Sequence, residues 1–383
     1  MSSDFVRYSP EVETIDPKID EYMTRIIDFW EKTVRESPER EGSGRAVRGA
    51  HAKTLGVARA EVEILGNAPA PYAQGIYARP GRHDALIRFS SASNHLGPDA
   101  QLGPVLGFAI KIFDIDGPKL VDDEPDSTTF DLVLKNNPVF VSSTARHYLV
   151  LQEVGNDSVK YLARGKTGFR ELLTDLLTGR GTFEQSDWAW EEMFAFVKAA
   201  QLPVRNPVVS TYWTMGVVRH GDYIAKLRVA PVEDSAAHVI HRDLDLRSGP
   251  DVFGPALADD LRAQAFDFDL QVQLCTDLDA MPVNDAMVEW PEKLSAFVTV
   301  GRVHIPRQDI SGSLSSEQCD ALAFNQWRVT SDHQPLGEIM KVRQIYSASA
   351  TMRRTLNHQP QNEPASADEV LPLPKLPERA SNG

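Results

Sequence analysis

The chain has 383 residues, which is long enough to bury a large core. It carries 40 Lys and Arg residues against 54 Asp and Glu residues, a net charge of −14, and this acidic balance argues against a nucleic-acid binder, whose affinity depends on clustered positive charge. Hydrophobic residues make up 42% and charged residues 25% of the chain, as in ordinary folded proteins, and no stretch approaches the roughly 20 apolar residues of a membrane span.

The two ends of the sequence and its cysteines carry no targeting or redox signal. The chain opens with Met-Ser-Ser-Asp-Phe-Val-Arg, without the basic and then apolar pattern of a secretory signal, and it ends with Ala-Ser-Asn-Gly, which is not a peroxisomal address. Cys275 and Cys319 belong to no Cys-x-x-Cys pair, and two cysteines make no disulfide framework. We therefore expect a soluble cytoplasmic protein with two reduced, inert thiols.

Hydrophobic periodicity predicts a helix, a group of strands and a helical insertion in the first half of the chain. Apolar residues recur at three- and four-residue spacing over residues 17–35, which predicts an amphipathic helix that begins near Pro17. The period then changes to two, and strand-like runs occur at residues 57–64, 86–90, 105–113 and 131–134. Residues 142–200 are rich in Leu, Glu and Arg and are expected to be helical.

Strands return in the second half of the chain, at residues 223–229, 266–274 and 296–300. About eight such runs suit a closed antiparallel barrel, since closure leaves no unpaired edge. A last helix is expected over residues 337–356, and five prolines predict an extended or disordered tail after it. The expected organisation is an N-terminal helical arm (1–45), a barrel domain (46–356) with the helical insertion (142–200), and a Pro-rich tail (357–383).

Two short clusters in the first strands contain residue types that perform chemistry. Arg48, His51 and Lys53 stand together before the first strand, where a histidine among small residues usually has a structural role. Arg88 and Ser90 interrupt an apolar strand, and a buried arginine needs an anionic partner because an unpaired buried charge is very costly. Taken alone, neither cluster identifies a function.

Two further clusters lie on either side of the second group of strands. Residues 131–140 contain an amide pair that begins at Asn136 and precedes a proline, a combination that most often makes a turn. On a helix, Arg343, Tyr346 and Arg353 fall three and seven residues apart and share one face, as they would on any packed helix surface.

Together, and in this order, the four clusters resemble the haem catalase superfamily, and more closely its short catalase-related branch. The resemblance covers about residues 45–357 and includes connecting segments at residues 203–213 and 322–337. It implies an α+β fold with a catalase-like, antiparallel eight-stranded β-barrel and inserted and flanking helices. It also implies that the long C-terminal extension of typical catalases is lacking.

The resemblance assigns a role to each cluster. His51 is expected to be the distal acid–base residue, Asn136 to orient the peroxide, and Tyr346 to bind the iron of haem b (iron protoporphyrin IX) as its axial ligand. The other expected haem contacts are Arg48, Arg88, Ser90, Arg343 and Arg353. One departure concerns the proximal arginine, which in the family stands four residues before the tyrosine. Val342 occupies that place here, and Arg343 stands three residues before Tyr346.

The function implied by the resemblance is that of a haem-dependent catalase-related peroxidase, which breaks the peroxide O–O bond heterolytically. Two alternatives remain open. In the first alternative, the chain is a haem enzyme that acts on an organic or fatty-acid hydroperoxide, as an allene oxide synthase-like dehydratase does. In the second, the chain is a non-catalytic haem-binding scaffold. The expected partners are hydrogen peroxide or an organic hydroperoxide, with no nucleic acid and no membrane span. Because catalase relatives are commonly oligomeric, the resemblance also points to a homo-oligomer.

Overall fold

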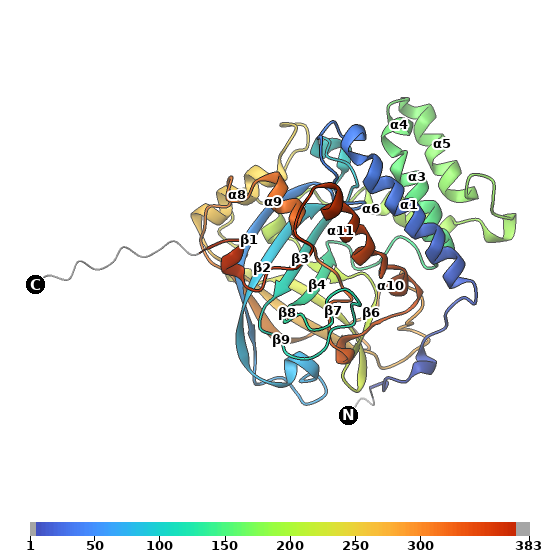
Figure 1. Ribbon diagram of the computed structural model, residues 1–383. Helices are drawn as coiled ribbons and strands as arrows, with labels where there is room; N and C mark the ends of the chain where they lie inside the picture. The colour runs from blue at the N-terminus through green and yellow to red at the C-terminus, as the bar shows by residue number, and fades with distance from the viewer. Residues whose placement is uncertain (1–4, 373–383) are drawn as a thin grey trace, which may run out of the picture.

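Eight antiparallel strands close into a barrel in the computed structural model, which describes residues 5–372 (Figure 1). In order around the barrel they are β1 (Thr54–Ile64), β2 (Gly81–Ser91), β3 (Leu106–Ile112), β4 (Phe130–Lys135), β5 (Tyr212–Thr214), β7 (Tyr223–Pro231), β8 (Phe266–Leu274) and β9 (Val298–Ile305). Pairing of β9 with β1 and of β8 with β7 closes the ring. The expected eight-stranded antiparallel barrel is confirmed.

Two short strands extend the sheet beyond the ring. β6 (Val217–His220) pairs with β7 on the same edge as β5, and β10 (Pro335–Leu336) pairs with β6. The sequence did not predict β5, β6 or β10, because strands of two to four residues are too short to show a period of two.

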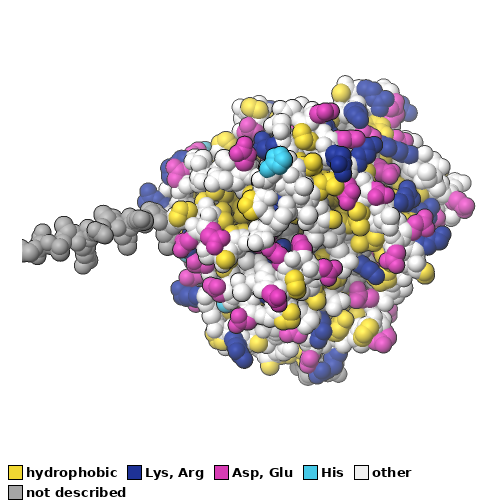
Figure 2. Space-filling view, viewed as in Figure 1, with side chains coloured by type: hydrophobic (Ala, Val, Ile, Leu, Met, Phe, Trp, Pro, Cys, Tyr) yellow, Lys and Arg dark blue, Asp and Glu magenta, His cyan; other side chains and the backbone are white. Residues whose placement is uncertain are grey.

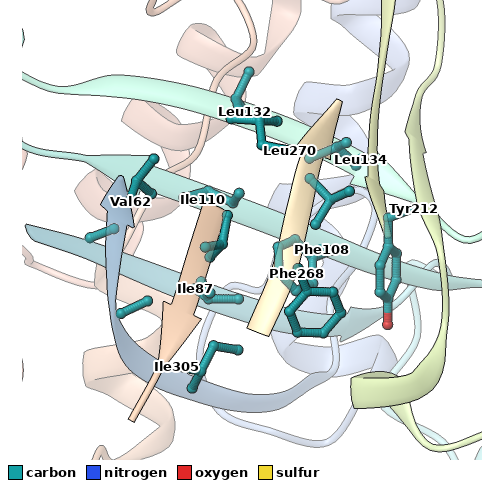
Figure 3. Close-up of a cluster of buried hydrophobic side chains, with 14 of the residues drawn as sticks. Val62, Ile87, Phe108, Ile110, Leu132, Leu134, Tyr212, Phe268, Leu270 and Ile305 are labelled. Atoms are coloured by element: carbon teal, nitrogen blue, oxygen red, sulfur yellow. The ribbon is translucent and has the colours of Figure 1, made fainter. Parts of the chain in front are cut away.

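The interior of the barrel is filled by apolar side chains from alternate positions of the strands (Figure 3). Phe108 contacts Tyr212 and Phe268, with ring centroids 4.8 Å and 5.3 Å apart. All three side chains are almost completely buried, and aromatic residues of this size contribute most of the apolar area in a core. This packing fixes the register of the strands, since a shift by one residue would turn the apolar side chains outward.

The register also places two rows of residues across the outer face of β2, β3 and β4. The first row is Ser90, Gly107 and Lys135, and the second is Arg88, Ala109 and Val133. Successive residues of a strand face opposite sides of the sheet, so both rows lie opposite to core residues such as Phe108 and Leu134. The polar residues of these strands therefore point out of the barrel, toward the helices that cover it.

Helices cover one side of the barrel and form the insertion between β4 and β5 (Figure 1). They are α1 (Ile19–Arg40), α2 (Asp99–Leu102), α3 (Ala145–Asn156), α4 (Ser158–Leu162), α5 (Gly165–Thr178), α6 (Trp190–Ala199), α7 (Glu233–Ala236), α8 (Phe253–Ala263), α9 (Ser316–Ala321), α10 (Glu338–Val342) and α11 (Ile345–Leu356). α11 lies over β3 and β4 and packs against α1. No described helix has the length and apolar character needed to cross a membrane.

The expected single helix over residues 337–356 is wrong in one respect, because the structure divides it into α10 and α11. At the junction the backbone N–H groups of Arg343 and Gln344 bond to carbonyls three residues earlier rather than four, which tightens the turn. The resulting break gives α11 a direction of its own across the barrel. Figure 2 shows acidic and basic side chains interspersed over the face that carries α11.

The described part of the Pro-rich tail packs against the barrel. The Glu363 carboxylate lies 3.2 Å from Lys111 Nζ and 2.6 Å from Arg354 Nη2. Lys111 also pairs with Asp131 at 2.8 Å, so this buried network joins β3, β4, α11 and the tail. Residues 373–383, with the last two of the five prolines, lie outside the described residues.

Candidate active site

One cavity lies between the outer face of β2–β4 and the helices α1 and α11. Six of the eight residues that the sequence singled out line it: Arg48, His51, Arg88, Ser90, Tyr346 and Arg353. They come from three separate segments of the chain, namely the loop before β1, the strand β2 and the helix α11. The two outer-face rows of the barrel form one wall of this cavity, and the helices form the other.

His51 is held in a strained but well-supported position in the loop before β1. Its backbone φ is 53°, in the left-handed region that residues other than glycine adopt at a cost of about 1–3 kcal/mol. Arg88 Nη2 donates a hydrogen bond of 2.6 Å to the His51 carbonyl, and the Ser90 hydroxyl lies 3.0 Å from His51 Nδ1. The strand β2 therefore fixes both the backbone and the ring of this histidine.

Gly107 provides the space in which the His51 imidazole lies. A Cβ atom at position 107 would stand 2.5 Å from His51 Nδ1 and 2.7 Å from Ser90 Oγ, closer than real Cβ contacts allow. The missing side chain lets the ring pack directly against β3. An isolated glycine in a strand often marks such a close approach.

The three arginines that line the cavity have too few counter-charges. Arg48, Arg88 and Arg353 are all buried, and Asp320 is the carboxylate that pairs with this group, at 3.1 Å from Arg48 Nη1. Arg88 bonds a hydroxyl and a carbonyl, and Arg353 bonds two carbonyls. Burial and the neighbouring Arg48 guanidinium lower the pKa of Arg88 and of Arg353 well below the ordinary value. At least two positive charges thus remain without a carboxylate.

Tyr346 presents its hydroxyl group near the start of α11. Arg343 Nη1 donates a hydrogen bond of 2.8 Å to Tyr346 Oη, and the guanidinium lies over the Tyr346 ring. The Trp30 ring from α1 packs edge-on against the tyrosine with centroids 5.3 Å apart. Arg343 therefore reaches the hydroxyl group of Tyr346, although it stands three residues before the tyrosine and not four.

Comparison with known proteins identifies the architecture. No protein-family model matches the sequence, and no curated protein sequence matches it. A fungal catalase, solved by crystallography, superposes with a TM-score of 0.56 over 88% of this chain and 68% of that chain, at 16% identity. Catalase A from Saccharomyces cerevisiae gives a TM-score of 0.55 over 83% of this chain and 64% of that chain, at 14% identity.

The chain has the catalase fold. It spans about two thirds of the length of these two catalases. At this level of identity the likeness concerns the fold, and the chemistry has to be argued from the cavity itself.

Asn136 is not among the residues that line this cavity. Its side-chain amide accepts a hydrogen bond of 2.7 Å from the backbone N–H of Leu106 and donates one of 3.0 Å to the carbonyl of Pro104. The amide thereby ties the end of β4 to the start of β3. The side chain on the cavity face is the preceding one, Lys135, because it shares a strand face with Val133, which lines the cavity.

Sequence reasoning missed three residues that shape the site of this catalase fold, namely Trp30, Gly107 and Lys135. Trp30 gave only the signal of an apolar position on an amphipathic helix. Gly107 did give a signal, since a glycine inside a strand pattern suggests a close backbone approach, whereas Lys135 only ends a strand. Their cross-strand pairing shows why both matter, because it puts the glycine and the lysine side by side at the histidine.

Proposed function

We propose that this chain is a haem-dependent oxidoreductase that consumes peroxides, with Tyr346 as the axial ligand of a ferric haem b and His51 as the acid–base residue on the opposite face. The observation that carries the proposal is that six of the residues assigned by the resemblance line one cavity, although they lie far apart in the sequence. Three of the six are buried arginines that have too few counter-charges. The catalase fold supports it at the level of architecture.

The donor set of the cavity fits haem better than a bare metal ion. Within residues 5–372, no group of three or more His, Cys, Asp or Glu side chains is placed to hold a metal. A single phenol oxygen suits an iron that brings its other ligands in a macrocycle. Arg48, Arg88 and Arg353 suit two propionates, because a planar guanidinium matches a carboxylate and the propionates would supply the missing negative charges.

Bound haem would supply a redox-active iron for cleavage of the peroxide O–O bond. His51 takes a proton from one peroxide oxygen and returns it to the departing oxygen. Ser90 and Gly107 hold the imidazole in place for both transfers, through the 3.0 Å contact and the absence of a side chain. Tyr346 would hold the iron through its phenol oxygen, and the 2.8 Å hydrogen bond from Arg343 Nη1 fixes the position of that oxygen.

Oxygen release tests this function directly. We expect the haem-loaded protein to evolve oxygen from hydrogen peroxide in an oxygen electrode, and His51→Ala to reduce the rate by about 10²- to 10⁴-fold, the usual contribution of a positioned acid–base residue. The Soret band should persist in the variant. His304→Ala, on β9 and paired with Asp267, is the matched control and should turn over like the wild type. A loaded wild-type protein without peroxide turnover would disprove the proposal.

The pH dependence of turnover follows from the burial of His51. Burial lowers the pKa of His51 to about 3, and the charges of Arg88, Arg343, Lys135 and Arg48 act in the same direction. Burial, the largest cause, persists when haem is bound. The imidazole is therefore neutral, and able to accept a proton, above about pH 3. We expect kcat/KM for peroxide to be flat from about pH 5 to 9, whereas an inflection near pH 6.5, as for an ordinary histidine, would contradict this assignment.

A further inference from the structure

A buried cation without a partner lies beside the active-site cavity. Lys135 is only 5% exposed, and its Nζ lies 4.6 Å from the centroid of the Phe140 ring. The Arg343 guanidinium lies 4.8 Å from the same centroid. Among residues 5–372, no carboxylate oxygen lies within 4.0 Å of Lys135 Nζ, and no described acceptor takes a hydrogen bond from it.

The strand register places this lysine next to His51. Lys135 is directly opposite Gly107 in the β3–β4 pair, and residues paired in this way have Cβ atoms about 5 Å apart on the same face of the sheet. The His51 ring lies against Gly107. Lys135 is therefore the cross-strand neighbour of Gly107 on the β4 side, as Ser90 is on the β2 side.

The energetics of Lys135 differ from those of the other buried lysine on this face. Lys111 is fully buried but pairs with Asp131 and Glu363 at 2.8 Å and 3.2 Å. Burial and the Arg343 guanidinium lower the pKa of Lys135 well below its ordinary value, and no acidic group raises it. A buried ammonium group without a carboxylate is strongly destabilising, and a bound anion would therefore stabilise the charged form of Lys135.

We propose that Lys135 anchors a subsite for a carboxylate beside His51, with Arg343 as the second cation and Phe140 as its apolar wall. Arg343 Nε is buried and has no hydrogen-bond partner within the described chain, so it has a free N–H for such a ligand. The carboxylate is either a free small anion or part of the peroxide substrate. Only the second source rests on the proposed function, and two experiments separate the sources.

The first experiment measures thermal unfolding of the protein as purified, in sodium acetate at constant ionic strength. At ten times its dissociation constant, acetate should raise the Tm of the wild type by about 2 °C. Lys135→Met should lose this rise, and Lys135→Arg should keep it. Without acetate, Lys135→Met should itself have a higher Tm than the wild type, because a buried amine without a hydrogen-bond partner is replaced by an apolar side chain, whereas Lys111→Met should have a lower one.

Lys226→Met is the matched control for this experiment. Lys226 is also 5% exposed and lies over an aromatic ring, that of Trp290 at 5.2 Å, but it donates a hydrogen bond of 2.8 Å to the Val288 carbonyl and belongs to β7. Its variant should show the full acetate shift. An equal acetate shift in Lys135→Met and the wild type, or no shift in the wild type, would overturn the subsite.

The second experiment compares cumene hydroperoxide with its 4-carboxy derivative on the haem-loaded protein. If the substrate carries the carboxylate, Lys135→Met should raise KM for the carboxylated compound by about tenfold and leave KM for cumene hydroperoxide unchanged. If both KM values are unchanged while the acetate shift is lost, the ligand is a free anion. Absence of a Soret band would defeat the proposed function, and the acetate experiment would still decide the subsite.

Discussion

Replacing Gly107 by alanine is expected to reduce peroxide turnover by about 100-fold, because the new Cβ would stand 2.5 Å from His51 Nδ1 and 2.7 Å from Ser90 Oγ. Neither atom belongs to a long flexible side chain that can move aside without breaking the 3.0 Å contact between them. Displacing a catalytic group by about 1 Å commonly costs this much in rate. The measurement is kcat/KM for peroxide on the haem-loaded variant.

The glycine substitution should affect the histidine and not the haem. We therefore expect the Soret band of Gly107→Ala to match that of the wild type. Gly155→Ala in α3 is a suitable control, since a Cβ at that position would meet nothing within 4 Å. Wild-type turnover in Gly107→Ala would show that the position of the His51 ring does not limit the reaction.

The second large effect concerns stability, because Glu363 joins the tail to the barrel. Glu363→Ala should lower the free energy of unfolding by about 3–5 kcal/mol, since it leaves Lys111, Arg354 and Arg328 buried with too few carboxylates. Urea denaturation measures the change. Glu292→Ala removes a carboxylate from an exposed pair with Arg228 and should have no measurable effect.

Acid denaturation gives an independent check on Glu363. Burial raises its pKa, but the charges of Lys111, Arg354 and Arg328 outweigh burial and hold the pKa at about 2, against an ordinary value of 4.5. The stabilisation is therefore complete above about pH 4.5 and is lost as the pH falls toward 2. Glu363→Ala should lack this part of the acid sensitivity. A loss of stability on acidification equal to that of the wild type would contradict the assignment.

The strands of the barrel were predictable where their sequence alternates. Residues 266–274 show one apolar and one polar residue in turn, and they form β8 with the same bounds. The short strands β5, β6 and β10 were not predictable, because their place depends on pairing with β7 and with each other. The break between α10 and α11 was also hidden, since no glycine or proline marks it.

The residues of the candidate site were predictable where a cluster in the sequence resembles a catalase motif. The clusters around His51, Arg88 and Tyr346 do meet at one cavity. The structure does not place Asn136 among the residues of this cavity, because its amide bonds the backbone of Leu106 and Pro104 at the end of β4. Lys135 carries no motif, and its position became meaningful only when the register placed it opposite Gly107.

The central claim is that Tyr346 binds a ferric haem in the cavity opposite His51. The most direct test is the absorption spectrum of the protein with added haem, for the wild type, for Tyr346→Phe and for Tyr77→Phe, a buried tyrosine whose hydroxyl has no hydrogen-bond partner among the described residues. A Soret band of tyrosinate-ligated ferric haem in the wild type and in Tyr77→Phe, shifted or lost in Tyr346→Phe, is the expected result. Identical spectra for the wild type and Tyr346→Phe, or no Soret band in the wild type, would contradict the claim.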